Sequence, residues 1–221
     1  MANKESFGTS VIPSYNFSKA KVIVSIACDF LGGWHSSVEA AKQYSVTRKL
    51  DDGKTDMSRH FQFESNLTLT GANADYRTPV KPSQEGLVAA QLYNVIAAAA
   101  GVASVPAGAA AIAGVEQAAK ELLSARGQSI VVAGSNDKNV QIIVNGINSL
   151  LGNYGSTVLI DKPVNYRKGD DAAMAGFIAD LESGKTKGVL FLGCNPVYDH
   201  ADGARIASAL KNAAVSVSTS G

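Results

Sequence analysis

The sequence has few cysteines and no excess of charge, and each of these excludes a class of protein. Two cysteines among 221 residues, Cys28 and Cys194, are too few for a metal cage or a disulfide-stabilised scaffold. They would form one disulfide only if two distant strand ends were adjacent, so free, buried thiols are expected. The 20 basic and 19 acidic residues give a formal net charge of +1. That balance offers no electrostatic basis for binding nucleic acid or an anionic membrane.

No hydrophobic run is long and continuous enough to predict a membrane span. The most apolar window, Leu87–Ala113, is rich in alanine and is broken by Gly101, Pro106 and Gly108. No secretory signal is visible, because polar residues follow Met1 almost at once. The hydrophobic fraction of 46% is that of a soluble globular protein, and 221 residues can bury one large core or two small ones.

Short apolar runs alternate with helical patterns, which predicts an α/β fold: a Rossmann-like parallel sheet flanked by helices. Apolar runs at Val22–Ala27, Ile130–Ala133 and Val189–Gly193 predict strands, and the last of these is expected to be covered on both faces. Phe61–Glu64 and Leu67–Thr70 alternate with period two, which predicts short strands or extended arms. Helices are expected at residues 38–44 and 85–100, along apolar stripes that begin at 115, 140 and 174, and at 202–210.

We expect two Rossmann-like units. The first covers residues 1–100 and includes a polar, turn-rich excursion at 49–75. The alanine- and glycine-rich segment 101–114 is the expected linker, because its side chains are too small to anchor it and it contains Pro106 and Gly108. The second unit covers residues 115–221.

Two of the predicted strands end alike, and these ends form the first candidate site. One strand leads into the loop Cys28–Trp34 and another into the loop Cys194–Asp199; each loop begins with cysteine followed by Asp or Asn. Pro196 cannot donate to a strand ladder and therefore stops the second strand. Ligands of open α/β sheets bind beyond the carboxyl ends of the strands. The two loops are therefore expected to border one cleft.

The other motifs carry less chemistry. Neither GxxxxGK[ST] nor GxGxxG occurs between a strand and a helix, so both common phosphate-binding signatures are missing. The loop Gly134–Asp137 offers N–H groups at a helix start, with Ser135 or Asn136 as the expected cap; this is a generic anion site, although the carboxylate of Asp137 opposes an anion. The three histidines lack partners at metal-ligand spacing, so surface or capping roles are expected: His35, His60 and His200.

Two interpretations of the strand-end loops stay open. Cys28 or Cys194 with His35 would form a nucleophilic pair if they met in space, but burial at a strand end raises the pKa of a thiol and favours inert packing. Trp34, the only tryptophan, either stacks on a planar ligand or fills the core, and we expect it to fill the core.

Four sets of segments carry a family resemblance: IPSYNF with KVIVSIACDFLGGW, LTLTGANADYRTPVK with PSQE, NGINSLLGNYGS, and LGCNPVY. In this order they resemble molybdopterin oxidoreductases of the dimethyl sulfoxide reductase type. The resemblance is closest to the iron–sulfur B subunit of bacterial alternative complex III, a quinol:electron-acceptor oxidoreductase. It implies that residues 8–217 correspond to domains II and III of that family, the two Rossmann-like domains that hold molybdopterin guanine dinucleotide. The parent subunit is far longer than this chain.

The resemblance also implies site residues and a departure from the family pattern. Active members carry Lys-Pro-Gly-Thr-Asp before the long helix, whereas Lys81–Glu85 reads KPSQE, so the Gly and the Asp are both replaced. No cysteine cluster for an iron–sulfur centre and no molybdenum-ligand segment is recognisable. The positions that would face the cofactor's nucleotide, as the remnant of a site, are Asp29, Glu85, Gly193, Asn195 and Pro196.

Three functions follow as hypotheses. The first is a cofactor-free structural domain in a quinol-oxidising respiratory complex attached to the periplasmic side of the inner membrane. Its partners would be the complex's other subunits and domains, with iron–sulfur clusters elsewhere in the parent chain. No catalytic residue, metal ligand, nucleic-acid partner or membrane span is assigned to this chain. The second is a true cofactor-binding portion of a molybdoenzyme. The third is a small independent α/β enzyme that uses a cysteine.

Overall fold

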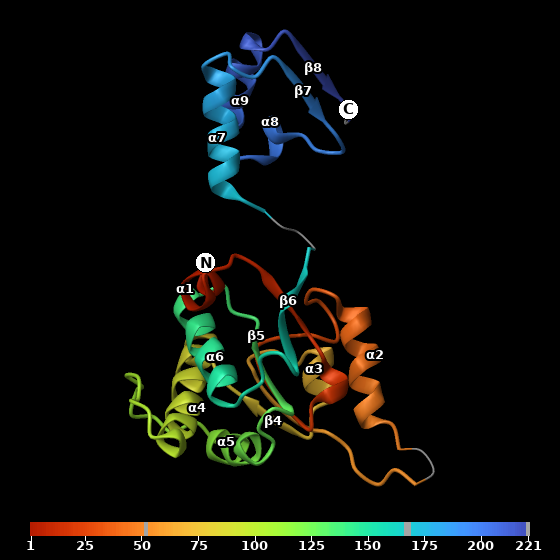
Figure 1. The fold of residues 1–221 in the computed structure, drawn as a ribbon, viewed down its shortest axis with the longest axis vertical. Coiled ribbons are helices and arrows are strands. Elements are labelled where there is room, and N and C mark those ends of the chain that lie inside the picture. Colours follow the sequence, from red (N-terminus) through yellow and green to blue (C-terminus); the bar gives the residue numbers. More distant parts are fainter. Residues whose placement is uncertain (51–52, 166–168, 220–221) are drawn as a thin grey trace. The chain divides into compact units, whose positions relative to one another are not determined.

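The computed structural model describes residues 1–50, 53–165 and 169–219 (Figure 1). The chain divides into two compact units, residues 1–166 and 167–221. The elements of the first are α1 (Ala2–Phe7), β1 (Ile12–Tyr15), η1 (Phe17–Lys19), β2 (Val22–Ile26), α2 (Ser37–Arg48), β3 (Arg59–Glu64), α3 (Leu69–Ala72), β4 (Tyr76–Pro79), η2 (Pro82–Gln84), α4 (Glu85–Ala100), α5 (Val115–Ser124), β5 (Ser129–Ala133), α6 (Lys138–Leu150) and β6 (Val158–Val164). Those of the second are α7 (Asp171–Glu182), β7 (Gly188–Phe191), α8 (Pro196–Asp199), α9 (Gly203–Ala209), η3 (Leu210–Asn212) and β8 (Val215–Ser218).

The first unit is built on a four-stranded parallel sheet with the order β4-β3-β2-β5. This confirms the predicted Rossmann-like α/β fold with a parallel sheet. Of these four strands β2 comes first in the chain, and its neighbours β3 and β5 lie on opposite sides of it. The direction of the crossovers therefore reverses between β2 and β5, which makes the carboxyl ends of these two strands the topological switch point.

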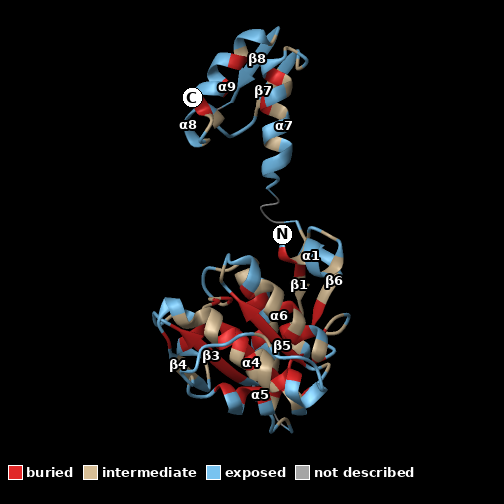
Figure 2. Cartoon of the chain, turned by 90° about the vertical axis from the view of Figure 1, so that its left-hand side faces the viewer, coloured by how far each residue is buried: buried red, intermediate tan, exposed pale blue. Residues whose placement is uncertain are grey.

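Helices cover both faces of this sheet (Figures 1 and 2). Every residue of β2 is buried, as expected for a continuous apolar run in a parallel sheet. Because side chains alternate along a strand, Val24 and Ile26 face the core formed with α4, α5 and α6. Ile23 faces the opposite core, where α2 packs with the rings of Phe17 and Phe30.

The segment 101–114 lies within the first unit, whereas the sequence pattern predicted a linker between two units there. β5 follows this segment and pairs with β2 along its whole length. Hydrogen bonds hold the segment to α4: the N–H of Val105 donates to Oδ1 of Asn94 at 2.8 Å, and Nε2 of Gln91 donates to the carbonyl of Ala110 at 2.6 Å. Amide side chains on a helix thus fix a stretch that has little side-chain bulk of its own.

The short strand or extended arm predicted at Leu67–Thr70 is wrong for its second half, because Leu69 and Thr70 begin helix α3. The Thr68 hydroxyl accepts a hydrogen bond from the N–H of Gly71 at 3.0 Å and caps the helix. Alternating Leu and Thr imitate the period of a strand, but a threonine hydroxyl can satisfy a helix start equally well. Helix α1 at the start of the chain was not predicted at all.

The second unit contains a two-stranded parallel sheet, β7–β8, and a small core of its own. Val189 packs with Ile178 and Ile206, from α7 and α9, whereas Leu190 points to the other face and is 63% exposed. The expectation that this strand is covered on both faces is therefore wrong, since helices pack on only one of them. Cys194, just beyond β7, is exposed, so the expected burial of its thiol is wrong too.

Candidate functional site

A crevice of about 470 Å³ lies at the carboxyl ends of β2 and β5. Trp34 and His35, from the loop after β2, line one side, and residues 134–136, from the loop after β5, line another. Val11, Ile12 and Pro13, which lead into β1, add an apolar border. The crevice thus lies at the topological switch point, where open α/β sheets bind their ligands, and its volume suits a small organic molecule.

The loop after β2 is held in one shape by its backbone. Ala27 and Ser36 lie at its two ends in the left-handed region, with φ of 49° and 55°. Residues other than glycine rarely adopt this conformation, because it costs roughly 1–2 kcal/mol per residue. Between them, the N–H groups of Gly33 and Trp34 both donate to the Asp29 carbonyl at 3.0 Å. The chain therefore holds Trp34 and His35 at the crevice in a strained but well-bonded turn.

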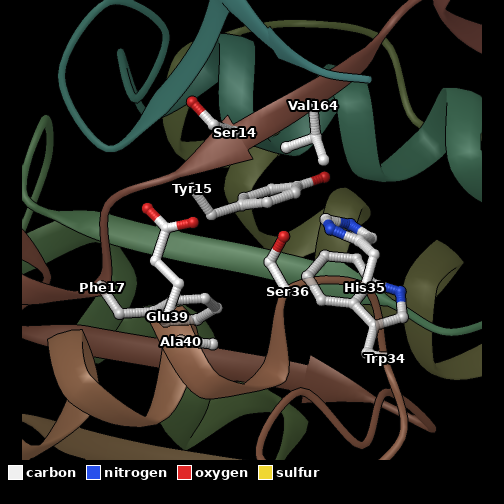
Figure 3. Close-up of a pocket in the computed structure, with 9 residues that line it drawn as sticks. All are labelled: Ser14, Tyr15, Phe17, Trp34, His35, Ser36, Glu39, Ala40 and Val164. Atoms are coloured by element: carbon white, nitrogen blue, oxygen red, sulfur yellow. The ribbon is translucent and has the colours of Figure 1, made fainter. Parts of the chain in front are cut away.

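Aromatic side chains from β1 and from this loop line the crevice, and Figure 3 shows them around a smaller cavity that they also line. The ring centroids of Trp34 and His35 are 3.8 Å apart, and those of Tyr15 and Trp34 are 5.0 Å apart. Trp34 is half-buried and packs against the core below, as expected, but it also lines the crevice. Because Trp34 contacts both the core and the crevice, it fits both interpretations left open by the sequence, filling the core and stacking on a planar ligand.

The polar side-chain atoms of His35 and Tyr15 have no hydrogen-bond partner among the described residues. Both ring nitrogens of His35 are shielded from solvent and form no hydrogen bond. The Tyr15 hydroxyl forms none either with the described part of the chain. Burial lowers the pKa of His35 and raises that of Tyr15, so both are neutral at pH 7. A second cavity of about 20 Å³ lies beside both side chains (Figure 3).

Asp29, the first residue expected to face a cofactor, bonds instead to the start of α3. Its Oδ1 accepts hydrogen bonds from the backbone N–H of Thr70 at 3.0 Å and from the Thr70 hydroxyl at 2.7 Å. Asp29 does not line the crevice. Its carboxylate therefore ties the loop after β2 to the segment after β3.

The remaining predicted site residues belong to two different units. Glu85 begins α4; its carboxylate is half-buried and has no hydrogen bond or ion pair with the described residues, and burial raises its pKa. Gly193, Asn195 and Pro196 belong to the second unit, where Asn195 precedes α8 and Pro196 begins it. Asn195 and Pro196 line a shallow cavity of about 310 Å³ together with Cys194. That the two groups converge on one cleft, and that the two cysteine loops border it, stays a prediction.

The two cysteines are free, as expected, but they differ in environment. Cys28 is fully buried; burial and then the nearby charge of Asp29 raise the pKa of its thiol. His35 makes no hydrogen bond to it. This environment opposes formation of a thiolate at Cys28 and gives the nucleophile hypothesis no support there.

The start of α6 is already capped by a side chain. Oδ1 of Asp137 accepts hydrogen bonds from the N–H groups of Asn139 at 2.7 Å and of Val140 at 3.1 Å. Asp137 is thus the cap, in place of the expected Ser135 or Asn136. The ammonium of the next residue, Lys138, pairs with Glu5 at 2.8 Å. The loop therefore offers an incoming anion neither free terminal N–H groups at these positions nor an unpaired lysine.

A buried polar row on β3 was missed by the sequence reasoning. His60, Gln62 and Glu64 point to one face of a strand that is buried on both faces. Nδ1 of His60 lies 3.1 Å from the Tyr44 hydroxyl, and Nε2 of Gln62 donates to Glu64 at 3.0 Å. Arg77 pairs with Glu64 at 2.6 Å. The alternation in RHFQFE was its only signal, and that pattern is typical of a strand with one solvent-facing side.

Among the described residues, no group of three or more His, Cys, Asp or Glu side chains is placed to hold a metal ion. No helix in the described ranges is long and apolar enough to cross a membrane. A scan against known protein families gives no match to this sequence, and a search of curated proteins gives none either.

Proposed function

We propose that this chain is a molybdopterin-oxidoreductase-like domain that serves a structural role, without a bound cofactor, in a quinol-oxidising respiratory complex. Its partners are the complex's other subunits and domains, on the periplasmic side of the inner membrane. The proposal joins the motif resemblance to the parallel Rossmann-like sheet of the first unit. The assignment to the family's domains II and III belongs to the same proposal.

The observation that carries the structural role is the engagement of Asp29. A residue that is to bind a nucleotide needs acceptor atoms directed at the ligand, whereas Oδ1 of Asp29 is shared by two donors of Thr70. Asp137 likewise satisfies the N–H groups that open α6. Groups that would otherwise contact a dinucleotide thus hold loops of the protein to one another.

Purification of the chain from a host that makes molybdopterin guanine dinucleotide tests this proposal. We expect neither the fluorescence of oxidised pterin nor stoichiometric molybdenum or iron in the native protein. A structural role further requires that the parent subunit assemble with its partners. Substitution of surface residues in this domain should reduce co-purification of the complex while leaving the domain folded. Stoichiometric pterin would contradict the proposal.

One observation favours a second candidate, a true cofactor-binding portion. The carboxylate of Glu85 is half-buried and forms no hydrogen bond or ion pair with the described residues, so it is available to bind a ligand. It takes the place of the aspartate in the family's KPGTD run. The same pterin assay separates the two candidates, and the variant Glu85→Gln should lower pterin content only if the second is correct.

A further inference from the structure

We propose that Tyr15, Trp34 and His35 form a binding site for a small, uncharged, planar ligand that carries a hydrogen-bond donor next to an acceptor, such as an aromatic carboxamide. This site goes beyond the structural role proposed above. It is also distinct from the residues expected to face a dinucleotide, because neither Asp29 nor Glu85 lines the crevice.

The first step of the argument is the unmet hydrogen-bonding capacity of His35. A neutral imidazole has one N–H donor and one acceptor nitrogen, and here both are shielded from solvent without a partner in the described chain. Buried polar groups in native proteins are nearly always paired, with protein, water or ligand. The Tyr15 hydroxyl, which points toward the His35 ring, forms no hydrogen bond with the described residues and is a further group that a ligand can contact (Figure 3).

The second step is the space around these groups. The cavity of about 20 Å³ beside His35 holds little more than one water-sized group. Tyr15, Trp34 and His35 line both this cavity and the crevice of about 470 Å³. A ring in the crevice would therefore lie near the indole of Trp34 and direct a small polar substituent at His35.

The third step is charge. Lys138, the only lysine among the described residues that line the crevice, is paired with Glu5, and the small cavity carries the carboxylate of Glu39. His35 is neutral at pH 7, because burial lowers its pKa. Apart from the amino terminus of Met1, the described lining residues present no unpaired positive group to a negative ligand. The Glu39 carboxylate already accepts a hydrogen bond from Nε2 of Gln43 at 3.0 Å and attracts a cation only weakly, whereas donor and acceptor atoms on one neutral group match His35 and Tyr15.

Nicotinamide and benzamide are suitable probes for the intact chain. Binding is followed by the fluorescence of Trp34, the only tryptophan, and by the side-chain nitrogen resonances of His35. We expect saturable binding with a Kd on the order of 1 mM or tighter, as is usual for ligands of this size. Absence of saturable binding by both probes would overturn the proposal.

The variants are chosen to keep the rings and remove only the polar atoms. His35→Phe and Tyr15→Phe should each weaken binding about tenfold, the effect of losing one hydrogen-bonding group. His200→Phe is the same chemical change in the second unit and should leave the Kd unchanged. Undiminished binding by His35→Phe, or equal loss by His200→Phe, would contradict the assignment.

Unfolding without ligand separates this site from a purely structural histidine. Because the ring nitrogens of His35 have no partner, His35→Phe should unfold at the same temperature as the unsubstituted chain or at a higher one. A clear fall in Tm would show that the nitrogens support the fold, and would overturn the proposal.

Discussion

At the scale of single residues, the carboxylate of Asp29 receives two hydrogen bonds from Thr70, at 3.0 and 2.7 Å. Asp29→Ala leaves a partly buried N–H without its acceptor, so the free energy of unfolding should fall by about 1–3 kcal/mol. Urea denaturation measures the change. Asp56→Ala, at an exposed position in the same unit, is the control and should have little effect. An equal midpoint for the two variants would contradict the role given to Asp29.

His60 makes stability depend on pH. Burial lowers its pKa to about 4 from the usual 6.5. The unfolded state therefore binds a proton as the pH falls below about 6.5 while the folded state resists it, so stability present at pH 7 is lost between pH 6.5 and 4. The loss amounts to about 3 kcal/mol for a shift of this size. His60→Leu should flatten this part of the stability profile, whereas His200→Leu should not.

Two carboxylates continue the loss at lower pH. Burial by itself would raise the pKa of Glu64, but hydrogen bonds from Thr68 and Arg77 outweigh it, and the pKa is lowered. Asp75 follows the same pattern with Arg48 as its partner. Groups with a lowered folded pKa stabilise the fold above their unfolded pKa and lose that effect as the pH falls through the folded value. The acid limb should therefore persist in His60→Leu below about pH 4.

At the scale of elements, the loops after β2 and β5 approach each other so closely that only glycine fits at 134. A Cβ there would lie 2.1 Å from the carbonyl oxygen of Ala27, which is backbone and cannot rotate away. Gly134→Ala should thus destabilise the first unit by about 1–3 kcal/mol and distort the crevice. Gly33→Ala, on the facing loop with open space around it, should be nearly neutral in urea denaturation. Similar midpoints for both would show that the loops move apart freely.

The elements with strong local signals were predictable from sequence. The apolar runs at β2 and β5 and the Glu85–Ala100 helix are confirmed, because burial on both faces of a strand, and an apolar helix that ends at a glycine, leave a local pattern. Contacts with a distant element leave no such local pattern. The segment 101–114 resembled a linker because the hydrogen bonds that hold it come from α4. Helix α3 was missed for another reason: its cap is a single threonine hydroxyl in a stretch whose alternation imitates a strand.

The candidate site was predictable only in part. The edge of the sheet follows from topology, and Trp34, from the loop after β2 that the sequence pattern singled out, lines the crevice there. The roles of the residues within that loop were not predictable. Asp29 was expected to contact a ligand, whereas its carboxylate accepts hydrogen bonds from Thr70, 41 positions away. His35 has no second metal ligand at a suitable spacing in the sequence. Its other feature, the absence of hydrogen-bond partners for both ring nitrogens among the described residues, cannot be read from the sequence.

At the scale of the whole molecule, each unit carries one cysteine, so thiol labelling reports on both. Cys194 is exposed and Cys28 is fully buried. We expect one thiol per chain to react quickly at neutral pH and the second only after unfolding. Mass spectrometry of the labelled peptides identifies them, and Cys194→Ser, which should abolish the fast phase, is the control. Fast labelling of Cys28 would mean that the first unit opens readily.

The two units should also differ in stability, because their cores differ in size. Two clusters fill the first unit on either side of its sheet, whereas four buried side chains form the core of the second: Ile178, Leu181, Ile206 and Ala209. A small unit buries a smaller share of its surface and is marginal by itself. Trp34 reports on the first unit alone, while far-UV circular dichroism reports on both. In urea, loss of dichroism should therefore begin before the change in Trp34 fluorescence, and coincident transitions would show that the units unfold as one.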